Sequence, residues 1–324
     1  SPVPYLITSG TTISTDPAIT TNGVIDFGKI YRSPAEDGPL ATYLFGSTSA
    51  FDTAIGFVNP NPNDLPIAVF KFQSLSLIGN PTIDLSNGGV TKVALTGVDG
   101  STSGPPGGTL TFTGLDLVGL ITQAGSINLT SNVSFQNIAL LLVYARGAGS
   151  KLTLASPILG SDRVFLAAEG SMQLMIGITA AERLKFVAGG DLVTTGPGGS
   201  ADFELNNIGG TITGGPGDRG NITLMVGGNL SSQNLSLLLA NNAGGNIGGT
   251  GGNISVTTGG DFTTSGDATF TIQNTTGTIN DGGNITLVTG GSISTGGELT
   301  HLVEAIKEPD NPACNTPPAA NLSL

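Results

Sequence analysis

The chain of 324 residues has almost no histidine, cysteine or tryptophan: it holds His301, Cys314 and no Trp. A disulfide framework or a Cys-ligated metal site needs more than one cysteine, so both classes are excluded. Any Ser-His or Cys-His catalytic pair would have to use His301, which lies near the C-terminus. The sequence therefore predicts no catalytic residues, no metal and no cofactor, and we expect a protein that is not an enzyme.

Positive charge is also scarce, because 11 Lys and Arg stand against 23 Asp and Glu, for a formal net charge of −12. A nucleic-acid-binding protein needs a basic surface, so that class is excluded. No apolar run approaches the roughly 18 residues of a membrane helix, so we expect no membrane span. The chain begins Ser1-Pro2-Val3 without a methionine. We interpret it as a mature, exported protein after signal-peptide removal, located outside a bacterial cell or on its surface.

Glycine is abundant, at 51 of 324 residues, and much of it belongs to a repeat. Three blocks read Gly-Asn-Ile-[Thr/Ser]-[Leu/Val] and are followed by a Gly-Gly corner, at residues 220–230, 252–262 and 283–293. The repeat period is 32 and then 31 residues. Each block alternates apolar and polar residues, which is the period of a half-buried strand. A further strand follows each corner, so one repeat predicts about three strands.

Three strands and three corners per repeat describe one coil of a parallel β-helix, in which equivalent strands stack about 4.8 Å apart. The alternative fold is a β-sandwich or jelly roll. In a β-helix, glycine would supply corners with positive φ, and equivalent Asn side chains would hydrogen-bond from coil to coil. The inward positions would form apolar ladders: Ile222, Ile254 and Ile285, and next to them Leu224, Val256 and Leu287.

Composition divides the chain into three parts. Residues 1–65 form an expected cap or docking region, rich in aromatic residues and proline. Residues 66–300 form the expected coils, which start near residues 68–76. Residues 301–324 form a polar, Pro-rich tail, and residues 302–307 are the best helical candidate. A cap is expected because the open ends of a solenoid otherwise pair with whatever is near.

The corners Gly227-Gly228-Asn229-Leu230 and Gly259-Gly260-Asp261-Phe262 resemble those of the filamentous-haemagglutinin-like family of secreted bacterial β-helix proteins. This likeness of repeat style covers roughly residues 105–300. It implies a right-handed parallel β-helix and a role as a surface adhesin or fibre. Asn59-Pro60-Asn61 is similar to the Asn-Pro-Asn turns of that family's secretion domain, although Pro62 follows where the family usually has Gly or Leu.

The repeat region has few titratable groups, which favours a structural role. We interpret the chain as an exported subunit that self-assembles head to tail into a fibre or surface layer, with copies of itself as the partner. One terminus would join the subunits by strand addition. The candidate residues for this joint are Tyr5, Leu6, Ile7 and Thr8, or Leu322 and Leu324.

Two other functions stay open. An adhesin would bind surface glycans or a host surface through the aromatic-rich N-terminal region. A polysaccharide-degrading β-helix enzyme would need clustered carboxylates, often with Arg or Lys. The one dense charged group of the coils is Asp162, Arg163, Glu182, Arg183 and Lys185, for which a solvated edge is the plainer interpretation.

Three further motifs have plainer explanations in the repeat. Nine Asn-x-Ser/Thr sequons occur, but an Asn corner followed by a β-branched strand creates them automatically. Residues 248–253 nearly match a calcium-binding nonapeptide, with Asn in place of Asp and no tandem copy. Outward Thr and Ser pairs are too scattered for an ice-binding face.

Overall fold

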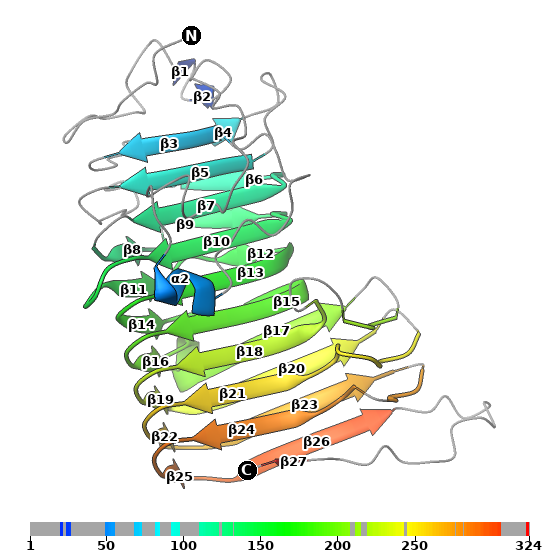
Figure 1. The fold of residues 1–324 in the computed structure, drawn as a ribbon. Helices are drawn as coiled ribbons and strands as arrows, with labels where there is room; N and C mark the ends of the chain where they lie inside the picture. The colour runs from blue at the N-terminus through cyan, green and yellow to red at the C-terminus, as the bar shows by residue number, and fades with distance from the viewer. Residues whose placement is uncertain are drawn as a thin grey trace. The chain divides into compact units, whose positions relative to one another are not determined.

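The computed structural model describes residues 20–21, 24–26, 49–55, 68–72, 82–84, 92–97, 110–122, 125–131, 133–207, 211–214, 219–242, 245–275, 277–280, 282–305 and 322–323. The fold is a parallel β-helix, which confirms the predicted class: three sheets are built from equivalent strands of successive coils (Figure 1). Within the described ranges, helix is limited to α2 (Ala50–Ala54) and a 3-10 turn at Pro197–Gly199. The chain divides into two compact units, residues 1–161 with 166–171 and residues 162–165 with 172–324.

Unit 1 contains the first coils, and its strand pairs are parallel apart from the hairpin of β1 and β2. The stacks are β2-β4-β6-β9-β12, β3-β5-β7-β10 and β8-β11. Its strands are β1 (Thr20–Thr21), β2 (Val24–Asp26), β3 (Ala68–Phe72), β4 (Thr82–Asp84), β5 (Lys92–Gly97), β6 (Leu110–Thr113), β7 (Leu117–Thr122), β8 (Ile127–Leu129), β9 (Val133–Gln136), β10 (Leu140–Ala145), β11 (Lys151–Leu154) and β12 (Ile158–Leu159), while β13 (Ser161–Ala168) contributes to both units.

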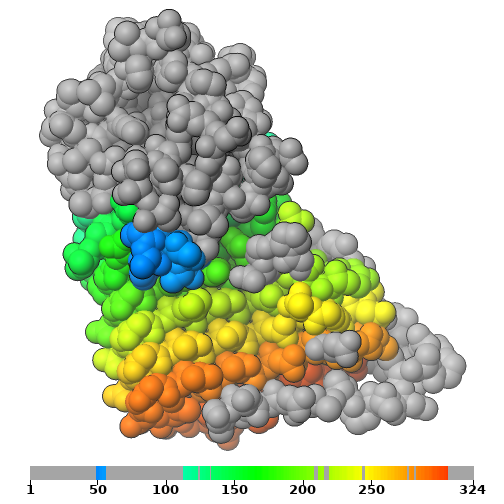
Figure 2. Space-filling model, in the orientation of Figure 1, coloured from blue at the N-terminus to red at the C-terminus, as the bar shows by residue number. Residues whose placement is uncertain are grey.

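Unit 2 stacks its strands in three rows: β15-β18-β21-β24-β27, β14-β16-β19-β22-β25 and β15-β17-β20-β23-β26. The long strand β15 serves two rows, because its first part pairs with β17 and its second part with β18. Figure 2 shows the resulting coils as bands from green to orange. The strands are β14 (Ser171–Leu174), β15 (Ile178–Ala188), β16 (Leu192–Thr194), β17 (Ser200–Asn207), β18 (Asn221–Val226), β19 (Leu230–Ser232), β20 (Asn234–Asn241), β21 (Ile254–Thr258), β22 (Phe262–Thr264), β23 (Ala268–Asn274), β24 (Ile285–Thr289), β25 (Ile293–Thr295), β26 (Leu299–Ala305) and β27 (Leu322–Ser323).

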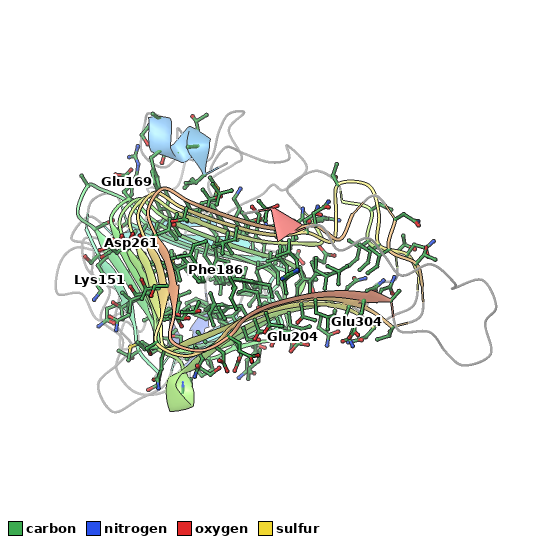
Figure 3. All side chains as sticks on the ribbon, turned by 90° about the horizontal axis from the view of Figure 1, so that it is seen from below. Lys151, Glu169, Phe186, Glu204, Asp261 and Glu304 are labelled. Atoms are coloured by element: carbon green, nitrogen blue, oxygen red, sulfur yellow. The ribbon has the colours of Figure 1, made fainter. Side chains whose placement is uncertain are left out.

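Apolar ladders fill the core of unit 2. Ile222 pairs with Ile254, and Ile254 with Ile285, and these side chains are 0–1% exposed. The neighbouring positions Leu224, Val256 and Leu287 are equally buried. Phe186 lies between the sheet layers, whereas Glu204 and Glu304 point outward (Figure 3). Burial stabilises each large apolar side chain by about 1.5–3 kcal/mol relative to exposure, so the ladders hold the coils together.

The helix expected at residues 302–307 is wrong. Strand β26 continues to Ala305 and pairs with β23 over its whole length, with Val303 opposite Ile272. The strand therefore also crosses the expected start of the tail at residue 301. A row of parallel backbone hydrogen bonds to an existing strand outweighs the weak helical propensity of this segment.

Side chains at the corners connect each coil to the next. The backbone N–H of Asn229 donates to Asp191 Oδ1 at 2.7 Å, and the N–H of Asp261 donates to Asn229 Oδ1 at 2.8 Å. Ser292 continues this row by donating its N–H to Asp261 Oδ1 at 2.7 Å. In the buried row, Asn207 Nδ2 donates to Asn241 Oδ1 at 2.8 Å. These bonds give partners to corner groups that the strands themselves leave unpaired.

Glycine has two different roles at the corners. Gly220, Gly252 and Gly283 adopt φ of +78°, +74° and +80°, as the sequence interpretation expected. The Gly-Gly corners differ, because Gly227 and Gly259 lie outside the positive-φ region. A Cβ on Gly259 would overlap the carbonyl oxygen of Gly227 in the preceding coil. The positive-φ explanation is therefore wrong for these corners, where close backbone approach requires glycine.

This difference predicts that Gly259→Ala destabilises unit 2, while Gly248→Ala does not. A Cβ on Gly248 would meet only the Cβ of Asn280 at 3.7 Å, an ordinary contact. Overpacking of a tightly packed site typically costs about 1–3 kcal/mol. Urea unfolding of the two variants measures the difference, and equal midpoints would rule out close approach as the reason for glycine.

Candidate functional site

All cations between residues 152 and 306 lie in one part of unit 2: Arg163, Arg183, Lys185 and Arg219. Arg163 lies on β13, Arg183 and Lys185 on β15, and Arg219 just before β18. Their neighbours Val164, Leu184 and Phe186 are buried in the core, so strand alternation turns the cations outward. We call these four cations with Asp162 and Glu182 the charged cluster.

Glu182 stands between two arginines from the neighbouring coils. Its Oε2 lies 3.6 Å from Arg163 Nε and 3.6 Å from Arg219 Nε, which is longer than a hydrogen bond. The Arg219 side chain is 53% exposed. Arg183 and Lys185 lie over the ring of Phe165, at 5.7 and 5.8 Å from its centroid. Four cations and two acids give the cluster a net charge of +2, or +1 if Asp218, outside the described residues, is counted.

Asp162 is the acid whose titration the cluster perturbs. Burial raises the pKa of Asp162 above its ordinary value, and repulsion from Glu182 raises it further. Attraction from Arg163 and Arg219 partly offsets both effects on this pKa. The ionised form of Asp162 is therefore disfavoured in the folded protein relative to the unfolded chain.

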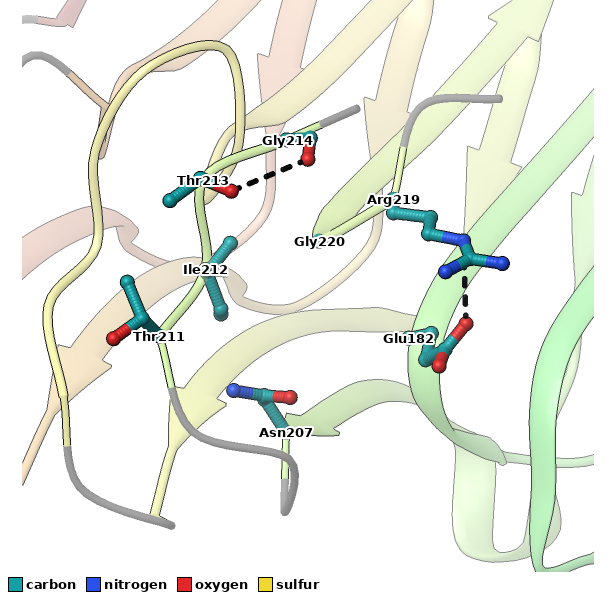
Figure 4. Close-up of a pocket in the computed structure, with 8 residues that line it drawn as sticks. All are labelled: Glu182, Asn207, Thr211, Ile212, Thr213, Gly214, Arg219 and Gly220. Carbon is teal, nitrogen blue, oxygen red and sulfur yellow. Dashed lines mark hydrogen bonds and ion pairs between the residues drawn. The ribbon is translucent and has the colours of Figure 1, made fainter. Parts of the chain in front are cut away.

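A polar pocket of about 260 Å³ adjoins the cluster. Glu182, Arg219 and Gly220 line one side of it, and Asn207 and residues 211–214 line the other (Figure 4). The loop residue Ile212 is held by its backbone bridge to Ile247 in the next coil. The pocket thus combines an exposed guanidinium with the hydroxyl groups of Thr211 and Thr213, whereas the Asn207 amide already donates to Asn241.

A second polar group lies in unit 1, where α2 docks on β10. Ser49 and Asp52 form a capping box at the start of α2. Asp52 is fully buried, and it accepts hydrogen bonds from the Tyr144 hydroxyl at 2.6 Å and from Arg146 Nη2 at 3.0 Å. Phe51 stacks on Tyr144 with ring centroids 6.2 Å apart. These contacts attach a segment of the N-terminal region to the side of a coil.

Titration in this second group indicates a structural role. Burial raises the pKa of Asp52, but hydrogen bonds from Tyr144, Ser49 and Arg146 outweigh it and hold that pKa below its ordinary value. Burial and the carboxylates of Asp52 and Glu169 raise the pKa of Tyr144 well above its usual range. The tyrosine stays protonated and the aspartate ionised at neutral pH, which suits a fixed hydrogen bond and not proton transfer.

The structure brings some of the expected site residues together. Asp162, Arg163 and Glu182 share one cluster, and Arg219 joins them from 37 residues beyond Glu182. Arg219 was missed, although its place as the last cation before the first Gly-Asn-Ile block could have identified it. His301 is exposed on β26, with β17, β20 and β23 between that strand and β15. Tyr5, Leu6, Ile7, Thr8, Cys314 and Leu324 lie outside the described residues.

The described residues offer no other candidate centre. Among them, no three or more His, Cys, Asp or Glu side chains gather as metal ligands would. No helix in the same part of the chain has the length and apolar character to cross a membrane. The sequon residue Asn274 is fully buried, and its amide donates to the carbonyls of Gly245 and Thr278, so it serves the corner.

Comparisons with known proteins identify no relative. A scan against protein-family models, a search of curated proteins and a search of solved structures each gave no match. The resemblance to filamentous-haemagglutinin-like proteins stays a prediction from the repeat style.

The raised pKa of Asp162 predicts that Asp162→Asn raises the melting temperature at pH 7. The substitution removes a charge that burial and Glu182 disfavour. The gain should shrink as the pH falls towards the ordinary aspartate value of about 3.9, because Asp162 then takes up a proton in the folded parent protein. Asp202→Asn, at an exposed aspartate of β17, is the control and should change little. A lower melting temperature for Asp162→Asn at pH 7 would contradict this assignment.

Proposed function

We propose that the protein is an exported structural subunit that assembles head to tail into an extracellular fibre or surface layer. The supporting observation is that two inward positions of the last coil, one on β25 and one on β26, are exposed, although Ile285 and Leu287 on β24 are buried. Ile293 is 37% exposed, whereas its partner Phe262 in the preceding coil is 0% exposed. His301 is exposed, whereas its partner Phe270 is 1% exposed. Inward positions that face water at the end of a solenoid leave that end open to docking by another copy.

Strand β27 supports joining by strand addition. It pairs with β24 in the same chain, with Leu322 opposite Ile285 and Ser323 opposite Thr286. Leu322 thereby extends the row Ile222-Ile254-Ile285, and Asn321-Leu322-Ser323-Leu324 matches the Asn-Ile-Thr-Leu of that row in sequence. The same pairing between two chains would be a domain swap, which is inexpensive because it replaces contacts by identical ones.

The geometry of such a joint favours a fibre over a closed oligomer. A parallel coil accepts a strand that runs in its own direction, so the joint is head to tail and need not close. Residues 220–300 suit stacking between copies because they contain no Lys or Arg and only four acids. Like charges at equivalent positions would repel one another about 4.8 Å apart.

This proposal predicts that Leu322→Asp abolishes filaments and leaves a folded β-rich protein. Position 322 is opposite Ile285 in the β24–β27 register, and a carboxylate at a position that continues an apolar row disfavours the joint. Asn311→Asp adds the same charge to the tail outside β27 and should leave filaments intact. Negative-stain microscopy with sedimentation velocity reads out assembly, and circular dichroism reads out folding.

Two results would overturn the proposal. One is a parent protein that stays monomeric at every concentration tested. The other is a loss of filaments in Asn311→Asp as well as in Leu322→Asp, because the effect would then come from added charge and not from the β24–β27 pairing. Should filaments persist in Leu322→Asp, deletion of residues 1–14 tests the N-terminal joint at Tyr5, Leu6, Ile7 and Thr8 in the same assay. If filaments also form without residues 1–14, neither terminus is the joint between subunits.

A glycan-binding adhesin is the second candidate, and the pocket beside the charged cluster favours it. Polysaccharide hydrolysis has less support. A glycosidase needs one carboxylic acid and one carboxylate placed on either side of the scissile bond. Glu182 instead lies between Arg163 and Arg219, at 3.6 Å from each.

A further inference from the structure

The charged cluster is positive, whereas the protein as a whole is negative. The chain has a formal net charge of −12, yet the described residues of this cluster sum to +2. Of its four cations, Arg219 is exposed, with 53% of its side chain accessible, whereas Arg163, Arg183 and Lys185 are half-buried. Within the described part of the chain, neither Arg163 nor Arg219 makes a hydrogen bond to Glu182, because both Nε atoms lie 3.6 Å from it. Because Arg163 Nε is buried, the exposed guanidinium of Arg219 is the group that a ligand can reach.

We propose that the pocket beside Arg219 binds the carboxylate of a uronic acid residue in an anionic polysaccharide. The guanidinium is a planar fork of N–H donors, which matches the two oxygens of a carboxylate. Glu182 lines the same pocket, so the cluster already holds one carboxylate near the Arg219 guanidinium. A ligand carboxylate would compete with it for Arg219.

The other walls of the pocket suit a sugar. Thr211 and Thr213 are exposed and supply hydroxyl groups, whereas Gly220 is buried and its N–H and C=O are already bonded to Glu182 and Gly252. Ile212 is buried and packs against the corner at Gly220, so Arg219 and the threonine hydroxyl groups would supply the ligand contacts. The volume of about 260 Å³ is below the roughly 300–1,000 Å³ of pockets for drug-sized ligands, and it fits a single sugar residue of a longer chain.

The test is isothermal titration of the full chain with polygalacturonate, with neutral dextran, dextran sulfate and single-stranded DNA as comparison polymers. Salt of about 0.15 M limits electrostatic attraction to roughly 8 Å, so the cluster's own charges and not the net charge decide binding. We expect polygalacturonate to bind and neutral dextran not to bind. Dextran sulfate and DNA should bind about tenfold more weakly, because neither presents an anionic group together with the free hydroxyl groups of a uronic acid ring to Arg219 and the threonines.

Substitutions then locate the site. Arg219→Gln should weaken polygalacturonate binding about tenfold, because it removes one charge-assisted hydrogen bond. The affinity of Arg219→Lys should lie between those of Arg219→Gln and the parent protein. Glu182→Gln should tighten binding, because it removes the competing charge. Lys151→Gln removes a cation from unit 1 and should change nothing. Melting curves establish that each variant is folded.

Three outcomes would overturn the inference: no binding of polygalacturonate, equal binding of dextran sulfate or DNA, or unchanged affinity in both Arg219→Gln and Glu182→Gln. The assembly proposal is independent of this result. Leu322→Asp should bind polygalacturonate like the parent protein, whereas Arg219→Gln should still form filaments.

Discussion

The structure depends on contacts between equivalent positions of successive coils. Strands pair in parallel with like residues opposite one another, and corner side chains accept the N–H of their counterpart in the next coil, as Asn229 does for Asp261. Every position must therefore tolerate a near copy of itself about 4.8 Å away. Apolar side chains and amides meet this demand, whereas like charges do not. The demand explains why charged residues are 10% of the chain, against about 25% in ordinary domains.

The same constraint determines what could be predicted from the sequence. Repeat spacing alone places Ile222, Ile254 and Ile285 opposite one another, so the parallel β-helix was predictable. The reason that the Gly-Gly corners need glycine was not predictable, because the close approach of Gly259 to Gly227 depends on how tightly two corners stack. The contacts of Tyr144 with Asp52 and of Arg219 with Glu182 do not repeat from coil to coil. Tyr144 and Asp52 are 92 residues apart, so periodicity contains no signal for their contact. Arg219 and Glu182 are 37 residues apart, close to one coil, so periodicity places them in adjacent coils but does not predict their ion pair.

The candidate functions lie where this regularity stops. Arg163, Glu182 and Arg219 come from successive coils and alternate in sign, which permits a charged row that like charges would not form. That row brings positive charge to the edge of a pocket on an acidic protein. The last coil is the other exception, because Ile293 and His301 have no further coil to cover them among the described residues. The charged row beside the pocket suits a ligand, and the last coil suits a second copy of the chain.

The most direct test of the coil-to-coil constraint is the pH dependence of melting for Asn229→Asp against Asn253→Asp. Both substitutions keep the oxygen that accepts the next coil's N–H. Asn229→Asp places a carboxylate between two others, those of Asp191 and Asp261. Asn253→Asp places one between two amides, those of Asn221 and Asn284. Repulsion raises the pKa of the carboxylates around position 229 in the folded state, so its cost is present at neutral pH and is relieved as the pH falls towards about 3.9. The account predicts that Asn229→Asp melts at a lower temperature than Asn253→Asp at pH 7 and that the gap narrows in acid. Equal melting temperatures at both pH values would contradict it.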